Sequence, residues 1–280
     1  DRAGSSIWRI DTRTGAEVPV AGRNGDAFNP RWSPSGDRLA FVSTEDGGPQ
    51  LWVRWMNGGE AVRLTGLPTS PSSMAWSPDG RSIAYSMLVK DEGPALGSAP
   101  LQKPEGAEWA EPLEVRDLLT YRADGQGYIE PGYEKIFVVP ATGGAPRQLT
   151  YGRYHDGGPL SWSPDGTTLY FGANRRANWE SDPVESEVYA LDVASGGLTQ
   201  LTDRDGPDGQ PVVSPNGRMI AYLGFDDAGR AYENDDLYVM DSDGSNVRNL
   251  TERWDYSPAG ITWDADGRGI YAQYDIGGAT

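Results

Sequence analysis

One short turn occurs five times along this chain, and its repetition limits the possible folds more than any other feature. The first residues of successive copies lie 44, 86, 51 and 50 positions apart. A period of about 40–50 residues built from short strands is typical of β-propeller blades. The copies are Trp32-Ser33-Pro34-Ser35-Gly36, Trp76-Ser77-Pro78-Asp79-Gly80, Trp162-Ser163-Pro164-Asp165-Gly166, Val213-Ser214-Pro215-Asn216-Gly217 and Trp263-Asp264-Ala265-Asp266-Gly267.

Each turn predicts a β-hairpin. Proline presets φ at the second turn position, Asp or Asn tolerates the third, and Gly takes a left-handed fourth. A β-rich run follows every copy, so each reads as strand A, tight turn, strand B. These runs are Leu39-Ala40-Phe41, Ile83-Ala84-Tyr85, Leu169-Tyr170-Phe171, Ile220-Ala221-Tyr222 and Ile270-Tyr271-Ala272.

A second hairpin follows in phase with the first. Its strand C is predicted at Ile7-Trp8, Leu51-Trp52-Val53, Ile136-Phe137-Val138, Val188-Tyr189-Ala190 and Leu237-Tyr238-Val239. After a glycine turn, strand D ends in Leu-Thr in every copy but the first. Two hairpins make one four-stranded antiparallel blade, so we predict an all-β propeller. An ordinary β-sandwich also has short strands, but it does not require the same two turns in the same order.

The chain begins at a strand C and stops after a strand B. Four blades are complete, at about 30–65, 74–150, 160–202 and 211–251, and half blades remain at 7–20 and 261–276. We treat residues 1–280 as one propeller domain or propeller fragment, with about five blade equivalents. Either the half blades pair and close a five-bladed ring, or the chain is an arc of a larger propeller. Unpaired half blades would leave open strand edges, and a homo-oligomer could pair them.

The 86-residue spacing predicts an insertion in one blade, at about 90–134. No further Ser-Pro-Asp-Gly turn lies between Val89 and Ile136. Long loops in compact domains are usually functional or disordered. This segment holds Trp109, Tyr121 and Tyr128, a composition too aromatic for a plain linker.

Composition excludes several partners. The formal net charge is −17, which argues against nucleic acid and anionic membranes, because binding phosphates needs clustered Lys and Arg. No apolar run approaches the ~18 residues of a membrane-spanning helix. The chain has no Cys, which excludes disulfides, thiolate zinc sites and a cysteine nucleophile. We expect a cytoplasmic location, with the periplasm as the alternative.

The sequence predicts no catalytic residue, metal site or cofactor in this chain. No Gly-x-Ser-x-Gly occurs, and the one histidine, His155, lies in a glycine-flanked loop that we interpret as a rim between blades. One His cannot build a multi-His metal site. The Asp241–Asn246 stretch superficially resembles a calcium loop, but its place in the repeat indicates a C–D hairpin turn.

Acidic residues also cluster in two further places. Asp203, Asp205 and Asp208 lie between two blades, and Glu233, Asp235 and Asp236 precede a strand. We interpret both groups as solvated loop carboxylates, with a calcium or amine site as the alternative.

The repeats resemble those of two groups of proteins. One is the TolB-type propeller, and the other is the N-terminal propeller of prolyl oligopeptidase family serine peptidases. The insertion, with Lys103-Pro104-Glu105-Gly106, then Tyr121-Arg122-Ala123-Asp124-Gly125, then Pro131-Gly132-Tyr133, is similar to that of bacterial acylaminoacyl-peptidase-like members. In that family the catalytic triad lies on a C-terminal α/β-hydrolase domain, which this chain lacks.

The resemblance implies a non-catalytic propeller that gates or admits short peptides to a serine peptidase domain. The hydrolase domain of the parent chain and short peptides would be its partners. Within the insertion, Arg122 could bind a peptide carboxylate or carbonyl, Asp124 or Glu130 could bind an amine, and Tyr128 could contact either partner. The alternative is that Arg122 and Asp124 only pair with each other. A self-standing TolB-type interaction scaffold is the alternative function.

Overall fold

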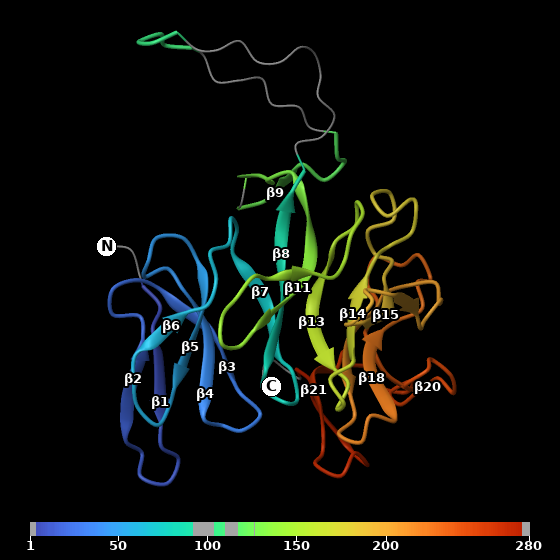
Figure 1. Cartoon of the computed structure of the whole chain (residues 1–280). Helices are drawn as coiled ribbons and strands as arrows, with labels where there is room; N and C mark the ends of the chain where they lie inside the picture. Colours follow the sequence, from blue (N-terminus) through green and yellow to red (C-terminus); the bar gives the residue numbers. More distant parts are fainter. Residues whose placement is uncertain (1–3, 92–103, 110–116, 126, 276–280) are drawn as a thin grey trace.

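The computed structural model describes residues 4–91, 104–109, 117–125 and 127–275, and the regular structure within them is entirely β. Four four-stranded antiparallel sheets stand side by side in chain order, with a two-stranded sheet at each end (Figure 1). This confirms the predicted propeller of four complete blades and two half blades. The part of the chain that the structure describes contains no helix able to cross a membrane.

In each blade, strands that are neighbours in the sheet also follow one another in the sequence. The half blades are β1 (Ile7–Ile10) with β2 (Glu17–Ala21), and β21 (Ala259–Trp263) with β22 (Ile270–Gln273). The first two complete blades are β3 (Ala27–Trp32), β4 (Arg38–Ser43), β5 (Gln50–Trp55), β6 (Ala61–Arg63), and β7 (Pro71–Trp76), β8 (Ser82–Lys90), β11 (Gly132–Pro140), β12 (Arg147–Gln148). The last two are β13 (Asp156–Trp162), β14 (Thr168–Ala173), β15 (Glu187–Asp192), β16 (Leu198–Gln200), and β17 (Asp208–Val213), β18 (Met219–Gly224), β19 (Asp236–Asp241), β20 (Arg248–Asn249).

The repeated turn is stabilised by its own side chains. In the second copy the Ser77 hydroxyl accepts a hydrogen bond from the Ser82 amide at 2.9 Å and donates to the Asp79 carboxylate at 2.6 Å. The donated bond is the main reason that the pKa of Asp79 lies below its usual value. Gly80 closes the turn at a φ of +67°, a left-handed conformation that favours glycine.

The tryptophan that leads the turn joins neighbouring blades. The indole of Trp76 donates to the carbonyl of Arg31 in the preceding inner strand at 3.0 Å. Trp162 donates to Ala75 at 3.2 Å, and Trp263 donates to Val212 at 2.8 Å. Trp32 has no complete blade before it, and it is 50% exposed. The tryptophan thus recurs at this position in three copies with the same contact, because its indole donates a hydrogen bond to a carbonyl of the preceding sheet.

The Leu-Thr ending of strand D has an equally local cause. The hydroxyl of each threonine accepts a hydrogen bond from an amide of strand C, that of the second residue in β5, β15 and β19 and that of the fifth residue in β11. These pairs are Thr65 with Leu51, Thr150 with Ile136, Thr202 with Val188, and Thr251 with Leu237, at 3.0, 3.0, 2.9 and 2.8 Å. The threonine thereby fixes the edge strand at the end of the blade that carries the B–C connections.

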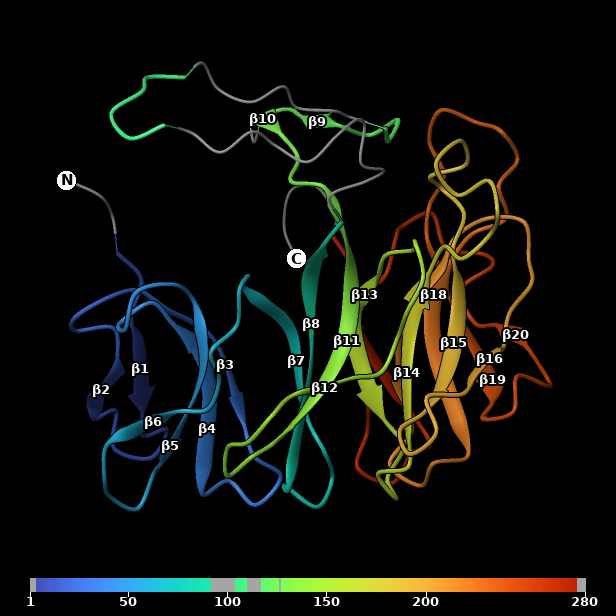
Figure 2. The same cartoon turned by 45° about the horizontal axis from the view of Figure 1, so that its top comes forward.

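The core lies between adjacent sheets. One cluster joins Val42 and Val53 of the first complete blade to Met74 and Tyr85 of the next. The terminal half blades join the same stack, since Ile7 packs with Phe41 and Trp263 packs against the cluster that contains Val239. Among the described residues β1–β2 and β21–β22 form separate sheets and share no ladder, so the structure does not show the closed ring (Figure 2).

Candidate functional site

An insertion between β8 and β11 extends from one end of the second complete blade (Figure 1). Its described part includes a hairpin of β9 (Arg122–Ala123) and β10 (Gly127–Tyr128). Arg122 lies opposite Tyr128 in this hairpin, and the rings of Tyr121 and Tyr128 stack with 6.4 Å between centroids. Arg122, Asp124 and Tyr128 are exposed there, and Arg122 makes no ion pair with Asp124.

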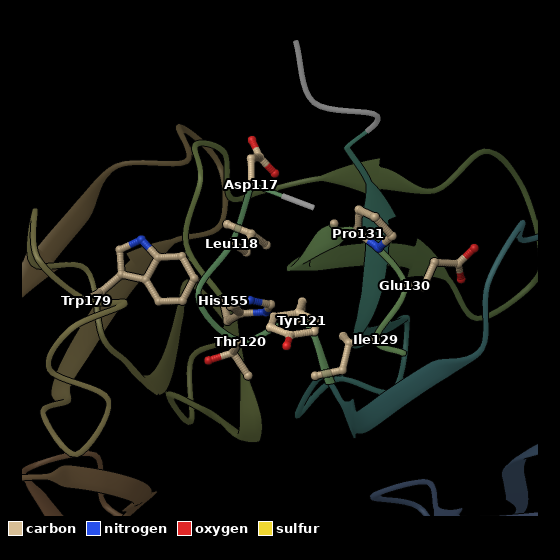
Figure 3. Close-up of a pocket in the computed structure, with 10 residues that line it drawn as sticks. Asp117, Leu118, Thr120, Tyr121, Ile129, Glu130, Pro131, His155 and Trp179 are labelled. Carbon is tan, nitrogen blue, oxygen red and sulfur yellow. The ribbon is translucent and has the colours of Figure 1, made fainter. Parts of the chain in front are cut away.

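A pocket of about 250 Å³ lies between the insertion and the third complete blade (Figure 3). Of the four predicted site residues, Glu130 lines it, whereas Arg122, Asp124 and Tyr128 do not. The structure therefore separates the predicted set into one pocket residue and three residues of an exposed hairpin. The pocket is lined by Asp117, Leu118, Thr120, Tyr121, Ile129, Glu130, Pro131, Gly132, His155 and Trp179.

Three aromatic side chains contact one another at this pocket. The imidazole of His155 lies 5.4 Å from the ring of Tyr133 and 5.4 Å from that of Trp179, between centroids. Tyr133 and Trp179 meet edge to face at 6.2 Å. Such edge-to-face pairs favour a fixed geometry beyond the burial of area. The three rings come from β11, from the connection before β13, and from the connection after β14.

Arg153 ties the insertion to the blades. Its guanidinium donates to the phenol oxygen of Tyr133 at 2.9 Å and to the carboxylate of Asp117 at 3.0 Å. It also pairs with Asp91 at 3.3 Å. Asp117 belongs to the insertion and lines the pocket, so Arg153 holds one wall of the pocket in place.

His155 is held as a neutral imidazole. Its Nδ1 accepts a hydrogen bond from the amide of Glu134 at 3.4 Å, which places the ring proton on Nε2. Burial of the ring is the main cause that lowers its pKa, and the nearby carboxylate of Glu134 opposes the shift. An imidazole with a lowered pKa is neutral at pH 7, so Nε2 is a hydrogen-bond donor at the pocket.

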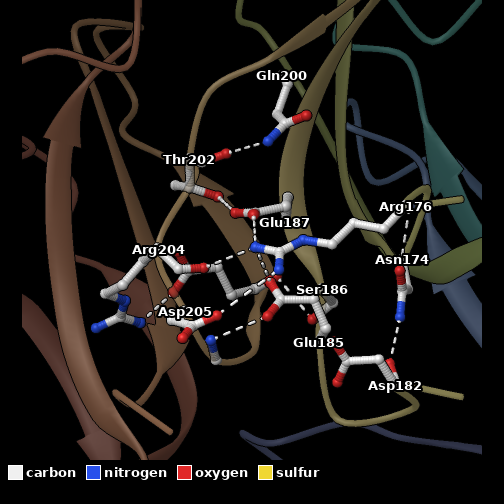
Figure 4. Close-up of polar contacts among 12 residues, drawn as sticks. Asn174, Arg176, Asp182, Glu185, Ser186, Glu187, Gln200, Thr202, Arg204 and Asp205 are labelled. Atoms are coloured by element: carbon white, nitrogen blue, oxygen red, sulfur yellow. Dashed lines mark hydrogen bonds and ion pairs between the residues drawn. The ribbon is translucent and has the colours of Figure 1, made fainter. Parts of the chain in front are cut away.

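The wall that carries Trp179 is anchored by a buried ion-pair network (Figure 4). Arg176, three residues before Trp179, contacts the carboxylates of Glu185 at 3.0 Å and Glu187 at 3.2 Å. Glu187 also accepts a hydrogen bond from the Thr202 hydroxyl at 2.7 Å. The carboxylate of Glu180 accepts a hydrogen bond from the amide of Leu119 at 2.9 Å. This bond connects the wall that carries Trp179 to the insertion.

Of the acidic residues between the blades, Asp203 and Asp205 are exposed, as predicted from the sequence, whereas Asp208 is not. Asp208 is fully buried and pairs with Arg204, and Asp205 lies 3.7 Å from Arg176. Burial raises the pKa of Glu187 to about 7 and that of Asp208 to about 6. The prediction was wrong for Asp208 because the sequence does not show that the first residue of β17 packs beneath the neighbouring connection.

The other acidic segments have structural partners. The Asp241–Asn246 stretch is the C–D hairpin turn, as predicted, with the Asp241 amide bonded to the carbonyl of Ser245. Asp236 accepts from the hydroxyl of Thr251, and Glu233 pairs with Arg230. Within the described ranges, no group of three or more His, Asp and Glu side chains is arranged to hold a metal ion.

The sequence signals missed two pocket residues. The repeat pattern indicates only a rim position for His155, and Trp179 lies outside the repeated turns on which the sequence analysis rests. The available signal was the length of the B–C connection in the third complete blade, where residues 174–186 separate β14 from β15. That connection is longer than residues 44–49 of the first complete blade.

Residues 106–228 match the family described as "Dipeptidyl peptidase IV (DPP IV) N-terminal region". The chain is also 37% identical over 171 residues to the uncharacterized peptidase YuxL of Bacillus subtilis, a match that covers 61% of this chain and 25% of that protein. The chain spans about a quarter to two fifths of the length of the first curated relatives that it matches.

Solved structures share the fold. An acylaminoacyl peptidase from Pyrococcus horikoshii superimposes with a TM-score of 0.68 at 16% identity, over 96% of this chain and 38% of that one. A putative TolB from Agrobacterium tumefaciens superimposes with a TM-score of 0.57 at 21% identity, over 96% of this chain and 88% of that one. At these identities the likeness concerns the propeller architecture alone.

Proposed function

This chain is a propeller of the kind that forms the N-terminal region of prolyl oligopeptidase family peptidases, and on that premise we propose that it admits short peptides to a serine peptidase domain. The observation that carries the proposal is the pocket between the insertion and the third complete blade. It gives one face of the propeller a concave site, which supports the proposal that a hydrolase domain would dock on the side that carries the insertion.

We assign different roles to the hydrolase domain and to the propeller. An α/β-hydrolase domain of the parent chain would supply the nucleophile, its base and the oxyanion donors. The propeller would contribute contacts to the peptide and would exclude larger chains. The exposed side chains of Arg122 and Tyr128 would then face the docked domain or the incoming peptide, since aromatic and Arg side chains are enriched at interfaces.

The experiment uses the full-length parent with the double substitution Arg122→Ala and Tyr128→Ala. We expect kcat/KM on short peptides to fall about tenfold, which corresponds to about 1.4 kcal/mol of transition-state stabilisation. Arg13→Ala, at the exposed turn between β1 and β2, is the control and should leave kcat/KM unchanged. Unchanged kinetics in a stably folded double variant would contradict a functional role for the hairpin.

A second candidate is a self-standing scaffold of the TolB type that binds other proteins. The superposition on the putative TolB structure favours this candidate, because the matched region makes up 88% of that chain. The parent reading frame distinguishes the two functions. A downstream Gly-x-Ser-x-Gly within an α/β-hydrolase pattern supports the peptidase, and its absence supports the scaffold.

A further inference from the structure

We propose that the pocket beneath the insertion is a subsite for one apolar side chain of a peptide, and that His155 donates a hydrogen bond from Nε2 to the carbonyl oxygen of the same residue. The inference rests on the proposed function for the choice of a peptide as the ligand. It adds the chemical class of the bound residue and the group that recognises its backbone.

The size of the pocket limits the ligand to one side chain. Its volume is about 250 Å³. Pockets that enclose drug-sized molecules begin at about 300 Å³, so this one is too small for a peptide segment. The remainder of the peptide would lie outside, along the exposed insertion.

The walls determine that the side chain is apolar. Leu118 and Ile129 contribute aliphatic surface, and Tyr121 and Trp179 contribute ring surface. An aromatic or branched aliphatic side chain buries its area against such walls, and aromatic pairs add about 0.5–1.5 kcal/mol beyond burial. Figure 3 shows Trp179 and Ile129 on opposite sides of the pocket, with Leu118 and Tyr121 between them.

The charged groups at the pocket already have partners, which disfavours a charged ligand side chain. Asp117 pairs with Arg153 at 3.0 Å, and Glu130 pairs with Lys90. A charged side chain that entered the pocket would lose its hydration and would have to compete for these partners. The pocket thus selects against Lys, Arg, Asp and Glu at the bound position.

His155 is the group that recognises the peptide backbone. Its Nδ1 is occupied by the Glu134 amide, and no described residue accepts a hydrogen bond from Nε2. The ring also contacts Tyr133 and Trp179, which fixes its orientation. The carbonyl oxygen of the bound residue, two bonds from its Cα, is an acceptor that a peptide always supplies beside its side chain.

The hydrogen bond that His155 donates from Nε2 depends on pH. The charged and titratable groups around the imidazole are Glu134, Lys135, Asp156 and Tyr133. When His155 is protonated, Nδ1 becomes a donor and can no longer accept from the Glu134 amide. Protonation therefore removes the hydrogen bond that orients the ring, and we expect affinity for the peptide to fall as pH decreases through the titration of His155.

One histidine in 280 residues makes the test direct, because its Hε1 proton is a single assigned NMR signal. The probes are N-acetyl-phenylalaninamide and ethylbenzene, which share the side chain but differ in the backbone. We expect both to shift the His155 signal, and the amide to bind about 3- to 10-fold more tightly, the effect of one net hydrogen bond.

Two variants isolate the donor. His155→Phe keeps a ring against Tyr133 and Trp179 but removes the N–H, whereas His155→Gln keeps a donor near Nε2. Binding is followed in both through 5-fluorotryptophan at position 179, assigned with Trp179→Phe. We expect His155→Phe to bind the two probes equally, and His155→Gln to retain a preference for the amide.

Three results would overturn the proposal. These are no shift of the His155 signal with either probe, equal binding of the probes by the unsubstituted chain, and an undiminished preference for the amide in His155→Phe. Binding to the 280-residue chain tests this inference, whereas kinetics of the parent test the proposed function. If the probes bind to the 280-residue chain but the Arg122→Ala and Tyr128→Ala double variant of the parent has unchanged kinetics, the proposed function is contradicted and the subsite is supported.

Discussion

At the residue scale, each member of the repeated turn satisfies a specific hydrogen-bonding group. The serine hydroxyl caps the turn, and the glycine adopts the left-handed conformation. The tryptophan of three copies donates to a carbonyl of the preceding inner strand. These hydrogen bonds are partly buried, and a typical hydrogen bond contributes about 0.5–1.5 kcal/mol, so each indole stabilises the contact between two blades.

Trp76→Phe should lower the free energy of unfolding by about 2 kcal/mol. The substitution leaves the Arg31 carbonyl without its donor and removes volume from a side chain that is 8% exposed. Trp32→Phe is the matched control, with an expected change within about 0.5 kcal/mol because Trp32 is half exposed. Urea denaturation measures both, and equal effects of the two substitutions would contradict this role.

A second residue-scale prediction concerns Glu187, whose pKa is raised from 4.5 to about 7. The folded state binds the proton more tightly than the unfolded state, so this group stabilises the fold below about pH 4.5. That contribution is lost as pH rises through 7. Glu187→Gln removes the titration and should keep its contacts with Thr202 and Arg176.

At pH 8 we therefore expect Glu187→Gln to be more stable than the unsubstituted chain, by roughly 2 kcal/mol, and at pH 5 the difference should nearly vanish. Chemical denaturation at several pH values measures it. Glu60→Gln, at an exposed loop, should show no such dependence. A difference that stays constant between pH 5 and pH 8 would show that Glu187 does not titrate in this range.

At the scale of the element, the inner strand of every blade contains a bulge at the same place. The third residue of the inner strand in each complete blade, and the second residue of β21, has a φ between +49° and +75°. These residues are Asn29, Ser73, Gly158, Gln210 and Gly260. The bulge bends the strand and increases its twist, which suits a strand that lies beside the inner strands of both neighbours.

Substitutions of Ser73 test the bulge. Ser73→Val should lower the free energy of unfolding by about 1–2 kcal/mol, because a branched side chain is strained at a φ of +49°. Ser73→Gly should be neutral or slightly stabilising, since glycine adopts this conformation without strain. Urea denaturation gives both values, and a valine variant as stable as the glycine variant would be inconsistent with the bulge.

The sequence predicts the elements of this fold well where the side chains that determine them make their contacts within one repeat. The turn glycines, the threonines of strand D and the strand bounds follow from local chemistry, and five copies reinforce each other. The pocket could not be predicted in the same way. His155 and Trp179 meet only because two connections of different length fold over the end of one blade. The burial of Asp208 likewise depends on a neighbouring connection.

At the scale of the whole molecule, the terminal half blades are part of the stack although they do not pair with each other. Ile261, Trp263 and Ile270 pack against the cluster of Ala221, Leu223, Leu237 and Val239. β22 nevertheless has no partner on its outer side among the described residues, and Tyr271 is 68% exposed. An open, apolar strand edge is a site for association with another chain.

Deleting residues 261–276 should therefore expose the cluster beneath and cause aggregation or a large loss of stability. Size-exclusion chromatography and the urea midpoint measure the two effects. Deletion of the exposed turn residues 12–14 between β1 and β2 is a control that removes no core side chain. A truncated chain that stays soluble and equally stable would show that the half blade contributes nothing to the fold.

We propose that the face with the insertion controls which peptides reach a docked peptidase domain. The most direct measurement compares kcat/KM for short peptides and for long unstructured chains in the full-length parent. The comparison is repeated after residues 91–131 are replaced by a short connection like residues 44–49. We expect the unsubstituted parent to prefer short peptides and the replacement to remove this preference. A preference for short peptides that persists unchanged after the replacement would contradict it.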